Sequence, residues 1–197
     1  LPSEHELMQR FETSRATIRK ALAGLAQMGL VYSRRGEGYF VSRPRLTLDL
    51  QRLEGLSECA EASGHQVFSE VLTTKEVPAN PIVAAGLNLD ADTPVFELKR
   101  LRHVNQAPFS FDVSYFPLLL GHELVKFDLS RIDVYSLLSD LLDDDLGHAD
   151  CMIEFTEAAQ DIALALDAQV GSSLIRMTRV AFMMSGKPVD FEYVYGR

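Results

Sequence analysis

Arg100 and Arg102 are spaced so that both side chains could bind the same anion. They lie two positions apart in the β-prone run PVFELKRLRHV, so on a strand both side chains point to the same face. Two neighbouring guanidinium groups repel each other unless an anion lies between them, and guanidinium binds phosphate or carboxylate well. The pair indicates an anion site. The alternative is that both arginines lie on the surface, among the many acidic residues of this chain.

Arg15 and Arg19 form a second pair, four residues apart, and therefore share one side of a helix. Ser14 precedes this helix and is a suitable N-cap. A different side of the same helix is apolar and comprises Ile18, Ala21, Leu22, Leu25 and Met28. A shorter helix is expected just before it, because Ser3 and Glu6 fit the S-x-x-E capping box.

A hairpin is expected after the two helices. The runs LVYS and YFVS flank a turn that contains Gly36 and Gly38, preceded by Arg34 and Arg35. Helix, short turn, helix and hairpin make a winged helix-turn-helix, whose second helix fits the major groove of DNA. In the wing, glycine permits a close approach of the main chain and arginine supplies charge. The alternative to a DNA-binding domain is a small structural subdomain whose exposed arginines are only hydrated.

The charge of the chain is divided unevenly. The formal net charge is −9, yet residues 1–45 hold eight Lys or Arg against four Asp or Glu. The remaining residues hold 11 basic and 24 acidic side chains, so the two parts carry +4 and −13. An acidic body repels DNA, so only the front part is expected to bind it.

The sequence lacks the motifs that are typical of several other functional classes. No run approaches 18 apolar residues, so we expect no membrane span. The polar start and two cysteines outside any CxxC pair indicate a cytoplasmic protein without a disulfide framework. The five histidines lack the spacing of metal ligands, and no GxSxG or P-loop is present. We therefore expect no metal, no cofactor and no catalytic residues.

The body of the chain is expected to be an antiparallel-rich α+β domain. Hairpin turns are expected at Asn105-Gln106 and Ser185-Gly186. The expected strands are VFSEVLTTKEVP, PVFELKRLRHV, APFSFDVSYFP, CMIEFTEA, SSLIRMTRVAFM and PVDFEYVY. The expected helices cover residues 57–63, 81–86, 134–143 and 158–166. The two hairpins resemble each other weakly, which suggests two successive hairpins of like design.

The front stretch LPSEHELMQRFETSRATIRKALAGLAQMGLVYSRRGEGYFVS is similar to the DNA-binding domain of GntR-family bacterial transcription regulators. The resemblance implies that Arg15, Thr17 and Arg19 contact DNA, with Ser14 at the start of the recognition helix. It also implies wing contacts around Gly36 and Gly38. Members have a further helix before LPSE, so we expect this domain to be incomplete at its N-terminus.

The body resembles the UTRA ligand-binding domain, which has a chorismate-lyase-like fold and defines the HutC subfamily of GntR regulators. The matching stretches include LSECAEASGH, PANPIVAAGLNLDADTPVFELKRLRHVNQAPFSFDVSYFP and IEFTEAAQDIALALDAQVGSSLIRMTRVAFMMSGKPVDFEYVY. The resemblance implies that Arg100 and Arg102 hold the phosphate or carboxylate of an effector. The further effector-binding residues it implies are Ser57, Asp112, Asp133, Tyr135 and Asp190. Each aspartate could instead be a salt-bridge partner or a turn residue.

These expectations combine into a DNA-binding domain at 1–44, a linker at 45–50 and an effector-binding and dimerisation domain at 51–197. The leading interpretation is a transcription regulator, a repressor of a catabolic or uptake operon, that binds double-stranded operator DNA as a homodimer. Its operator binding would respond to a small anionic metabolite such as a sugar phosphate, phosphonate or carboxylate. One alternative is an enzyme of chorismate-lyase-like fold acting on a small acid. Another is a DNA-binding protein whose body only dimerises.

Overall fold

The computed structural model describes residues 1–27, 30–34, 36–41, 60 and 65–197. It divides into two compact units, Leu1–Leu46 and Thr47–Arg197. Within the described part of the chain, no helix is long and apolar enough to cross a bilayer.

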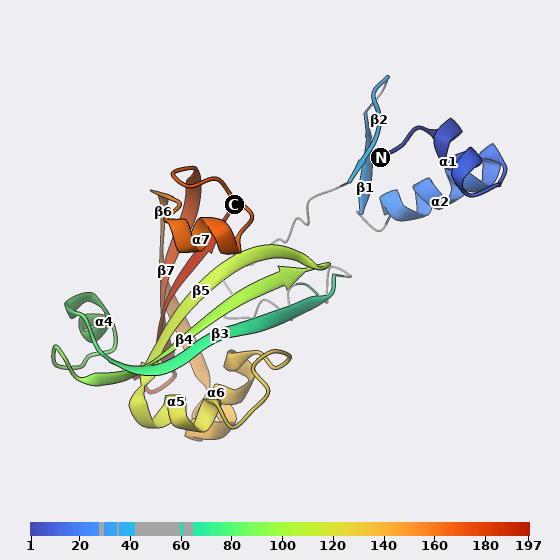
Figure 1. The fold of residues 1–197 in the computed structure, drawn as a ribbon. Helices are drawn as coiled ribbons and strands as arrows, with labels where there is room; N and C mark the ends of the chain where they lie inside the picture. Colours follow the sequence, from blue (N-terminus) through green and yellow to red (C-terminus); the bar gives the residue numbers. More distant parts are fainter. Residues whose placement is uncertain (28–29, 35, 42–59, 61–64) are drawn as a thin grey trace. The chain divides into compact units, whose positions relative to one another are not determined.

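The front unit contains two helices and a hairpin, as predicted. In chain order they are α1 (Glu4–Arg10), α2 (Arg15–Gln27), β1 (Val31–Arg34) and β2 (Gly38–Val41) (Figure 1). The predicted capping box is present: Ser3 N donates to Glu6 Oε2 at 2.7 Å, and Glu6 N donates to Ser3 Oγ at 3.2 Å. The Ser3 backbone N–H and the Ser3 hydroxyl both donate to Glu6 Oε2, and these two hydrogen bonds lower the pKa of Glu6. A small core beneath α2 is formed by Ile18, Leu22 and Val31.

The wing is a regular antiparallel hairpin. Its register runs from Val31 opposite Val41 to Arg34 opposite Gly38. Gly36 and Gly38 have φ values of 84° and 103°, which side chains with a Cβ rarely adopt. The turn therefore depends on glycine at these two positions. Arg35 lies outside the described residues.

The second unit is built on one six-stranded antiparallel sheet in the order β3-β4-β5-β8-β7-β6 (Figure 1). The strands are β3 (Val67–Pro78), β4 (Pro94–Val104), β5 (Ala107–Pro117), β6 (Leu146–Glu157), β7 (Ser173–Met183) and β8 (Pro188–Gly196). The helices are α4 (Pro81–Gly86), α5 (Leu118–Leu124), α6 (Val134–Leu142) and α7 (Gln160–Ala165). This α+β architecture with an antiparallel sheet confirms the predicted fold class.

The helices cover opposite faces of the sheet. On β4, Phe96 and Leu98 pack into the core that α5 and α6 close, whereas Leu101 packs into a second core closed by α7. Val95 packs with α4 on the same side as Leu101. Successive strand residues alternate between faces. Arg100 therefore shares the face of Phe96, Leu98 and the helices α5 and α6.

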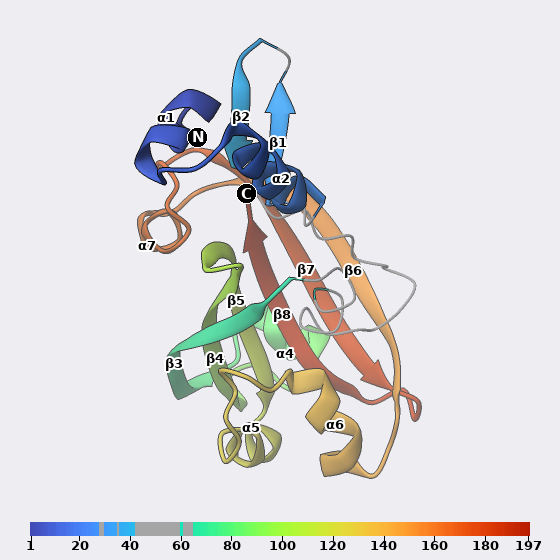
Figure 2. The same ribbon diagram turned by 90° about the vertical axis from the view of Figure 1, so that its right-hand side faces the viewer.

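Two similar hairpins meet at the centre of the sheet. β4 turns into β5 through Asn105 and Gln106, whose φ values are 49° and 68°, and β7 turns into β8 through Gly186 at 81°. β5 pairs with β8, so β5, β8, β7 and β6 lie side by side (Figure 2). The predicted turns and the two successive hairpins are present.

Three sequence expectations differ from the structure or fall outside it. No helix was predicted at Leu118–Leu124, because this short segment, LLLGHEL, contains a glycine and has no side-chain N-cap that would mark its start. The strand β6 begins at Leu146 rather than at Cys151; its first residues include Gly147 and Asp150, which have low β-propensity, and its pairing with β7 shifts after Leu146. The predicted helix at 57–63 and the linker at 45–50 lie outside the described residues, apart from Ala60, which is helical and buried.

Candidate functional site

The predicted DNA-contacting arginines lie exposed on α2. The side chains of Arg15 and Arg19 are 69% and 65% exposed. Arg15 Nε donates to Glu4 Oε2 at 2.8 Å, and Arg19 Nε lies 3.8 Å from Glu4 Oε1. One carboxylate in the first turn of α1 thus lies against both arginines. Since only Nε of Arg15 is engaged with Glu4, its two terminal nitrogens remain available for a further partner.

Ser14 and Thr17 begin the same helix. Thr17 N donates to Ser14 Oγ at 3.2 Å, and the hydroxyl oxygens of the two residues lie 2.9 Å apart. Ser14 is therefore the N-cap of α2, as its sequence position predicted. Both hydroxyls are exposed at the positive end of the helix dipole, where a phosphate group is favoured.

Arg34 is held in place at the tip of the wing. Its guanidinium lies 5.7 Å from the ring centre of Tyr32 and 5.3 Å from that of Phe40, and Nη1 lies 3.4 Å from Glu37 Oε2. The aromatic faces and the carboxylate orient this cation beside Gly36 and Gly38.

A second group of charges lies buried on the sheet face that Arg100 shares with α5 and α6. We call it the charged cluster, and it comprises Arg100, Arg102, Asp112, Asp133, Tyr135, Arg179, Asp190 and Glu192. The strands β4, β5, β8 and β7 supply most members, and Asp133 and Tyr135 come from the start of α6.

Arg102 is the better compensated of the predicted arginine pair. Its Nη1 donates to Asp133 Oδ2 at 3.3 Å, and its Nε lies 2.8 Å from Asp112 Oδ2. The second contact is an ion pair rather than a hydrogen bond. Burial lowers the pKa of Arg102, but Asp112 and Asp133 outweigh this and raise it above its usual value.

Arg100 is more deeply buried and has fewer partners. Its side chain is 2% exposed, and its Nη2 lies 3.9 Å from Glu192 Oε1. Among the residues that the structure describes, neither Nε nor Nη1 has a hydrogen-bond partner. Burial and the neighbouring Arg102 both lower the pKa of this guanidinium. A buried cation with two unsatisfied donors is costly, and an anionic oxygen placed beside it would remove that cost.

The opposite end of the charged cluster is organised by Arg179 and Tyr135. Arg179 Nε donates to Glu192 Oε2 at 3.1 Å, and Ser114 Oγ donates to Glu192 Oε1 at 3.2 Å. The guanidinium of Arg179 lies 4.7 Å from the ring centre of Tyr135, whose hydroxyl donates to Asp190 Oδ2 at 3.2 Å. These contacts join β5, β7, β8 and α6 into one polar network.

The acids of the charged cluster differ in how readily they ionise. Burial raises the pKa of Asp190 well above its usual value, and the nearby Glu192 carboxylate raises it further. Burial also tends to raise the pKa of Glu192. The positive charges of Arg179, Arg102 and Arg100 outweigh this effect of burial, so the pKa of Glu192 is lowered. Burial also raises the pKa of Asp112, against the pull of Arg102. Among the carboxyl groups of the cluster, Asp190 is therefore the one best able to hold a proton, whereas Glu192 stays ionised.

The structure brings six of the seven predicted effector residues into this cluster, and Ser57 lies outside the described residues. Sequence reasoning missed Arg179 and Glu192. In the first hairpin Asp112 lies opposite Arg100, and in the second hairpin Glu192 lies opposite Arg179, so Glu192 is the structural counterpart of Asp112.

A period-two signal could have found part of the missed set. Ser110, Asp112 and Ser114 alternate with Phe111 and Val113 along one strand. Asp190 and Glu192 alternate with Phe191 in the strand that pairs with it. Polar residues at every second position of two central strands indicate a polar patch on a buried face.

Comparisons with known proteins agree with both units. Residues 1–41 match the family described as bacterial regulatory proteins, gntR family, and residues 62–197 match the UTRA domain. The chain is 29% identical over 189 residues to the uncharacterized HTH-type transcriptional regulator YurK of Bacillus subtilis (strain 168), covering 96% of this chain and 78% of YurK.

A second relative carries a functional name. It is the probable fructoselysine utilization operon transcriptional repressor of Escherichia coli (strain K12), 26% identical over 197 residues, covering 100% of this chain and 81% of that protein. The crystal structure of PhnF from Mycobacterium smegmatis has the same fold, with a TM-score of 0.74 at 21% identity, covering 100% of this chain and 86% of PhnF. These relatives are transcription regulators rather than enzymes. The chain therefore belongs to the GntR family of bacterial transcription regulators and carries a UTRA domain as its second unit.

Proposed function

We propose that this regulator binds a small anionic metabolite in the charged cluster and that the bound anion controls its affinity for operator DNA. The observation that carries the proposal is the buried Arg100 guanidinium, with two donors that no described residue satisfies. A phosphate, phosphonate or carboxylate group supplies oxygens that accept from such a guanidinium in a charge-assisted contact.

The remaining members of the charged cluster suit the rest of such a metabolite. Asp190 and Tyr135 are hydrogen-bonded to each other and can bind hydroxyl or amino groups. Glu192 stays ionised and shared between Arg100 and Arg179, so it keeps the cationic side of the cluster in one geometry. A sugar phosphate, an aminophosphonate or a hydroxylated carboxylate combines both kinds of group.

In the front unit, we assign DNA contacts to the exposed side chains of α2 and the wing. Arg15 and Arg19 are placed to reach base edges or phosphates, and Ser14 and Thr17 to bind a phosphate at the start of the helix. Arg34 and its neighbouring glycines would contact the backbone or minor groove. A two-fold operator is read by two equivalent recognition helices, so the acting species is a homodimer in the cytoplasm.

The direction of control is repression of a catabolic or uptake operon, released by the metabolite. Support comes from the relative in Escherichia coli, whose name assigns it a repressor role for a sugar-derivative utilization operon. The anion binds the DNA-free state more tightly than the DNA-bound state and thereby shifts the population away from the operator.

The test measures operator affinity in the presence of a panel of small anions. A fluorescent operator, selected by the full chain from random duplexes, is titrated with wild type, Arg100→Lys and Arg131→Lys. Arg131 is 85% exposed and serves as the matched control. We expect at least one anion to weaken operator binding by tenfold or more in wild type and Arg131→Lys, on the order of the 1–3 kcal/mol typical of allosteric coupling.

In Arg100→Lys, we expect operator affinity without the anion to match wild type and the response to be lost. If every sugar phosphate, phosphonate and carboxylate in the panel leaves wild-type operator binding unchanged, the second unit serves only to dimerise. If Arg100→Lys responds as wild type does, the metabolite binds elsewhere.

A further inference from the structure

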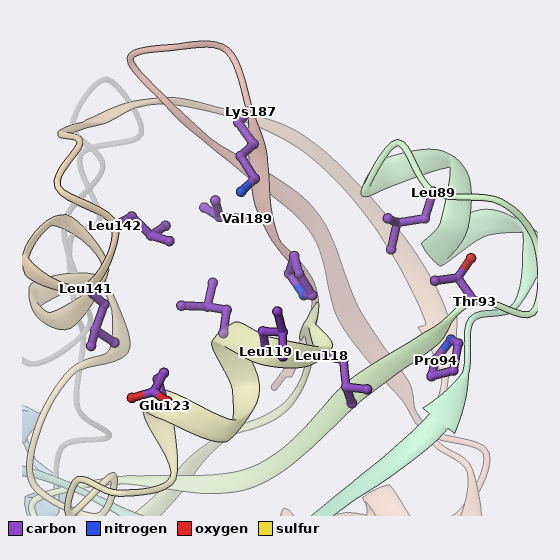
Figure 3. A pocket seen from close by; sticks show the side chains of 12 residues that line it. Leu89, Thr93, Pro94, Leu118, Leu119, Glu123, Leu141, Leu142, Lys187 and Val189 are labelled. Carbon is purple, nitrogen blue, oxygen red and sulfur yellow. The ribbon is translucent and has the colours of Figure 1, made fainter.

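An apolar cavity lies in the second unit, apart from the charged cluster. Its volume is about 570 Å³, and nine of its twelve lining residues are Leu, Pro or Val (Figure 3). It is bounded by α5, the end of α6, the turn between β7 and β8, and the segment that leads into β4. Cavities of 300–1,000 Å³ with mostly apolar walls and a few polar groups are typical of small-molecule sites. None of its lining residues belongs to the charged cluster.

The apolar wall is made largely of leucines from separate elements. Leu118 and Leu119 come from α5, Leu142 from the end of α6, and Leu89 from the segment before β4. Leu119 is 81% exposed. Leu118, Leu142 and Leu89 are half-buried and pack against the core, so each of them presents only part of its side chain to the cavity. A ligand seated on these leucines would bury apolar area that now faces water.

The polar groups at this cavity are not equivalent. Glu123 already accepts two hydrogen bonds from Lys126 Nζ, at 2.6 and 2.7 Å. The Lys187 ammonium makes no hydrogen bond or ion pair with any residue that the structure describes. Figure 3 shows the Lys187 side chain extending toward Val189 and into the pocket. The cavity thus combines leucine walls with one exposed ammonium group that has no protein partner among the described residues, while its single carboxylate is paired.

We propose that this cavity is a second ligand site, which binds a small amphipathic monoanion with an apolar body and a single carboxylate. The carboxylate pairs with Lys187, and the apolar body contacts Leu118, Leu119 and Leu142. One lysine matches a single charge, whereas a phosphate dianion would favour a cluster of arginines such as that around Arg100. The site shares no residue with the metabolite site proposed above, so either assignment can fail alone.

The first experiment measures binding of straight-chain carboxylates to the full chain by titration calorimetry, below their micelle concentrations. Hexanoate, octanoate and decanoate are compared with decylamine, which has the same chain as decanoate and the opposite charge. We expect one decanoate per chain, affinity that rises about fourfold per CH₂ group, and no saturable binding of decylamine.

Two variants test the assigned contacts. Lys187→Gln removes the cation and should weaken decanoate binding about fivefold, whereas Lys20→Gln in the front unit should leave it unchanged. Leu119→Glu places a carboxylate beside the ligand and should weaken binding by more than tenfold. Leu164→Glu on α7 is the matched control, because Leu164 is also 81% exposed.

Three results would overturn the proposal. The first is the absence of saturable decanoate binding to wild type. The second is equal decanoate affinity in wild type, Lys187→Gln and Leu119→Glu. The third is a wild type that fails to bind decanoate while Leu119→Glu alone converts dimers into monomers in sedimentation experiments, since a second copy of the chain then covers the leucines.

Discussion

The two units use arginine in opposite surroundings. Arg15 and Arg19 lie on the surface of α2 and share the carboxylate of Glu4, while Arg100 and Arg102 are almost completely buried on β4. Exposed charges cost little to hold and are screened by salt, so they contribute little to stability and remain available to DNA phosphates. Buried charges are costly unless compensated, so their partners fix both the stability and the ligand preference of the site.

The largest expected effect comes from removing Arg102. Arg102→Leu leaves Asp112 and Asp133 buried without their cation, and breaking a buried pair in this way costs about 3–5 kcal/mol. Urea unfolding of the full chain measures the loss. Arg131→Leu breaks only an exposed 3.8 Å pair with Asp128 and should change the free energy of unfolding by less than about 0.5 kcal/mol. Equal losses in the two variants would show that burial makes no difference.

The reverse pattern is expected for Arg15. Arg15→Ala should weaken operator binding by about 1–3 kcal/mol, roughly fivefold to 150-fold, and change the free energy of unfolding by less than about 0.5 kcal/mol. Fluorescence anisotropy at several salt concentrations measures the affinity and the number of phosphates neutralised. If Arg15→Ala destabilises the fold but leaves operator affinity intact, this arginine has a structural role, and the contrast between exposed and buried arginines does not hold.

Protonation of Asp190 gives the buried cluster a pH dependence opposite in direction to that of Glu6 in the front unit, whose pKa is lowered. Burial raises the pKa of Asp190 in the folded chain, so above its ordinary value of 3.8 the unfolded chain ionises while the folded chain keeps the proton. Rising pH then favours the unfolded state by up to about 1.4 kcal/mol per pH unit until the folded pKa is reached.

Asp190→Asn removes this titration and still offers Tyr135 an acceptor. The free energy of unfolding of the variant, relative to that of wild type, should therefore increase as pH rises from 5 to 8. Glu192 does not titrate in this range, because its pKa is lowered. Chemical denaturation at each pH measures the difference. Parallel pH profiles would contradict the raised pKa.

The smallest expected effect is at Glu4, which lies against both exposed arginines. Glu4→Gln should change the free energy of unfolding by less than about 0.5 kcal/mol, because the pair is exposed. The ratio of specific to non-specific DNA affinity should fall about threefold, since Arg15 loses the charged partner that orients it. Competition with random duplex DNA measures this ratio, and Glu12→Gln is the control. An unchanged ratio would mean that Glu4 does not position Arg15.

Local signals made much of the fold predictable. Ser3 with Glu6 begins α1, and Asn80 begins α4 by accepting from the amides of Ile82 and Val83. The turn at Asn105-Gln106 fixes the register of the first hairpin. Each of these signals lies within a few residues of the element that it defines.

The elements that escaped prediction depend on distant residues. The helix α5 packs directly on β4, where a Cβ on Gly121 would lie 2.1 Å from Phe96 Cβ. Arg179 and Glu192 join Arg100 only because β5 pairs with β8. A single sequence places both hairpins but does not show how they pair, and that pairing assembles the charged cluster.

The most direct test of the central claim is to measure the affinity of the identified anion for the free protein and for the protein–operator complex by titration calorimetry. Coupling between two sites is reciprocal, so the account predicts weaker anion binding to the complex by the same factor by which the anion weakens operator binding. It also predicts that Arg100→Lys abolishes that difference. Equal anion affinity in the free protein and in the complex would contradict the account.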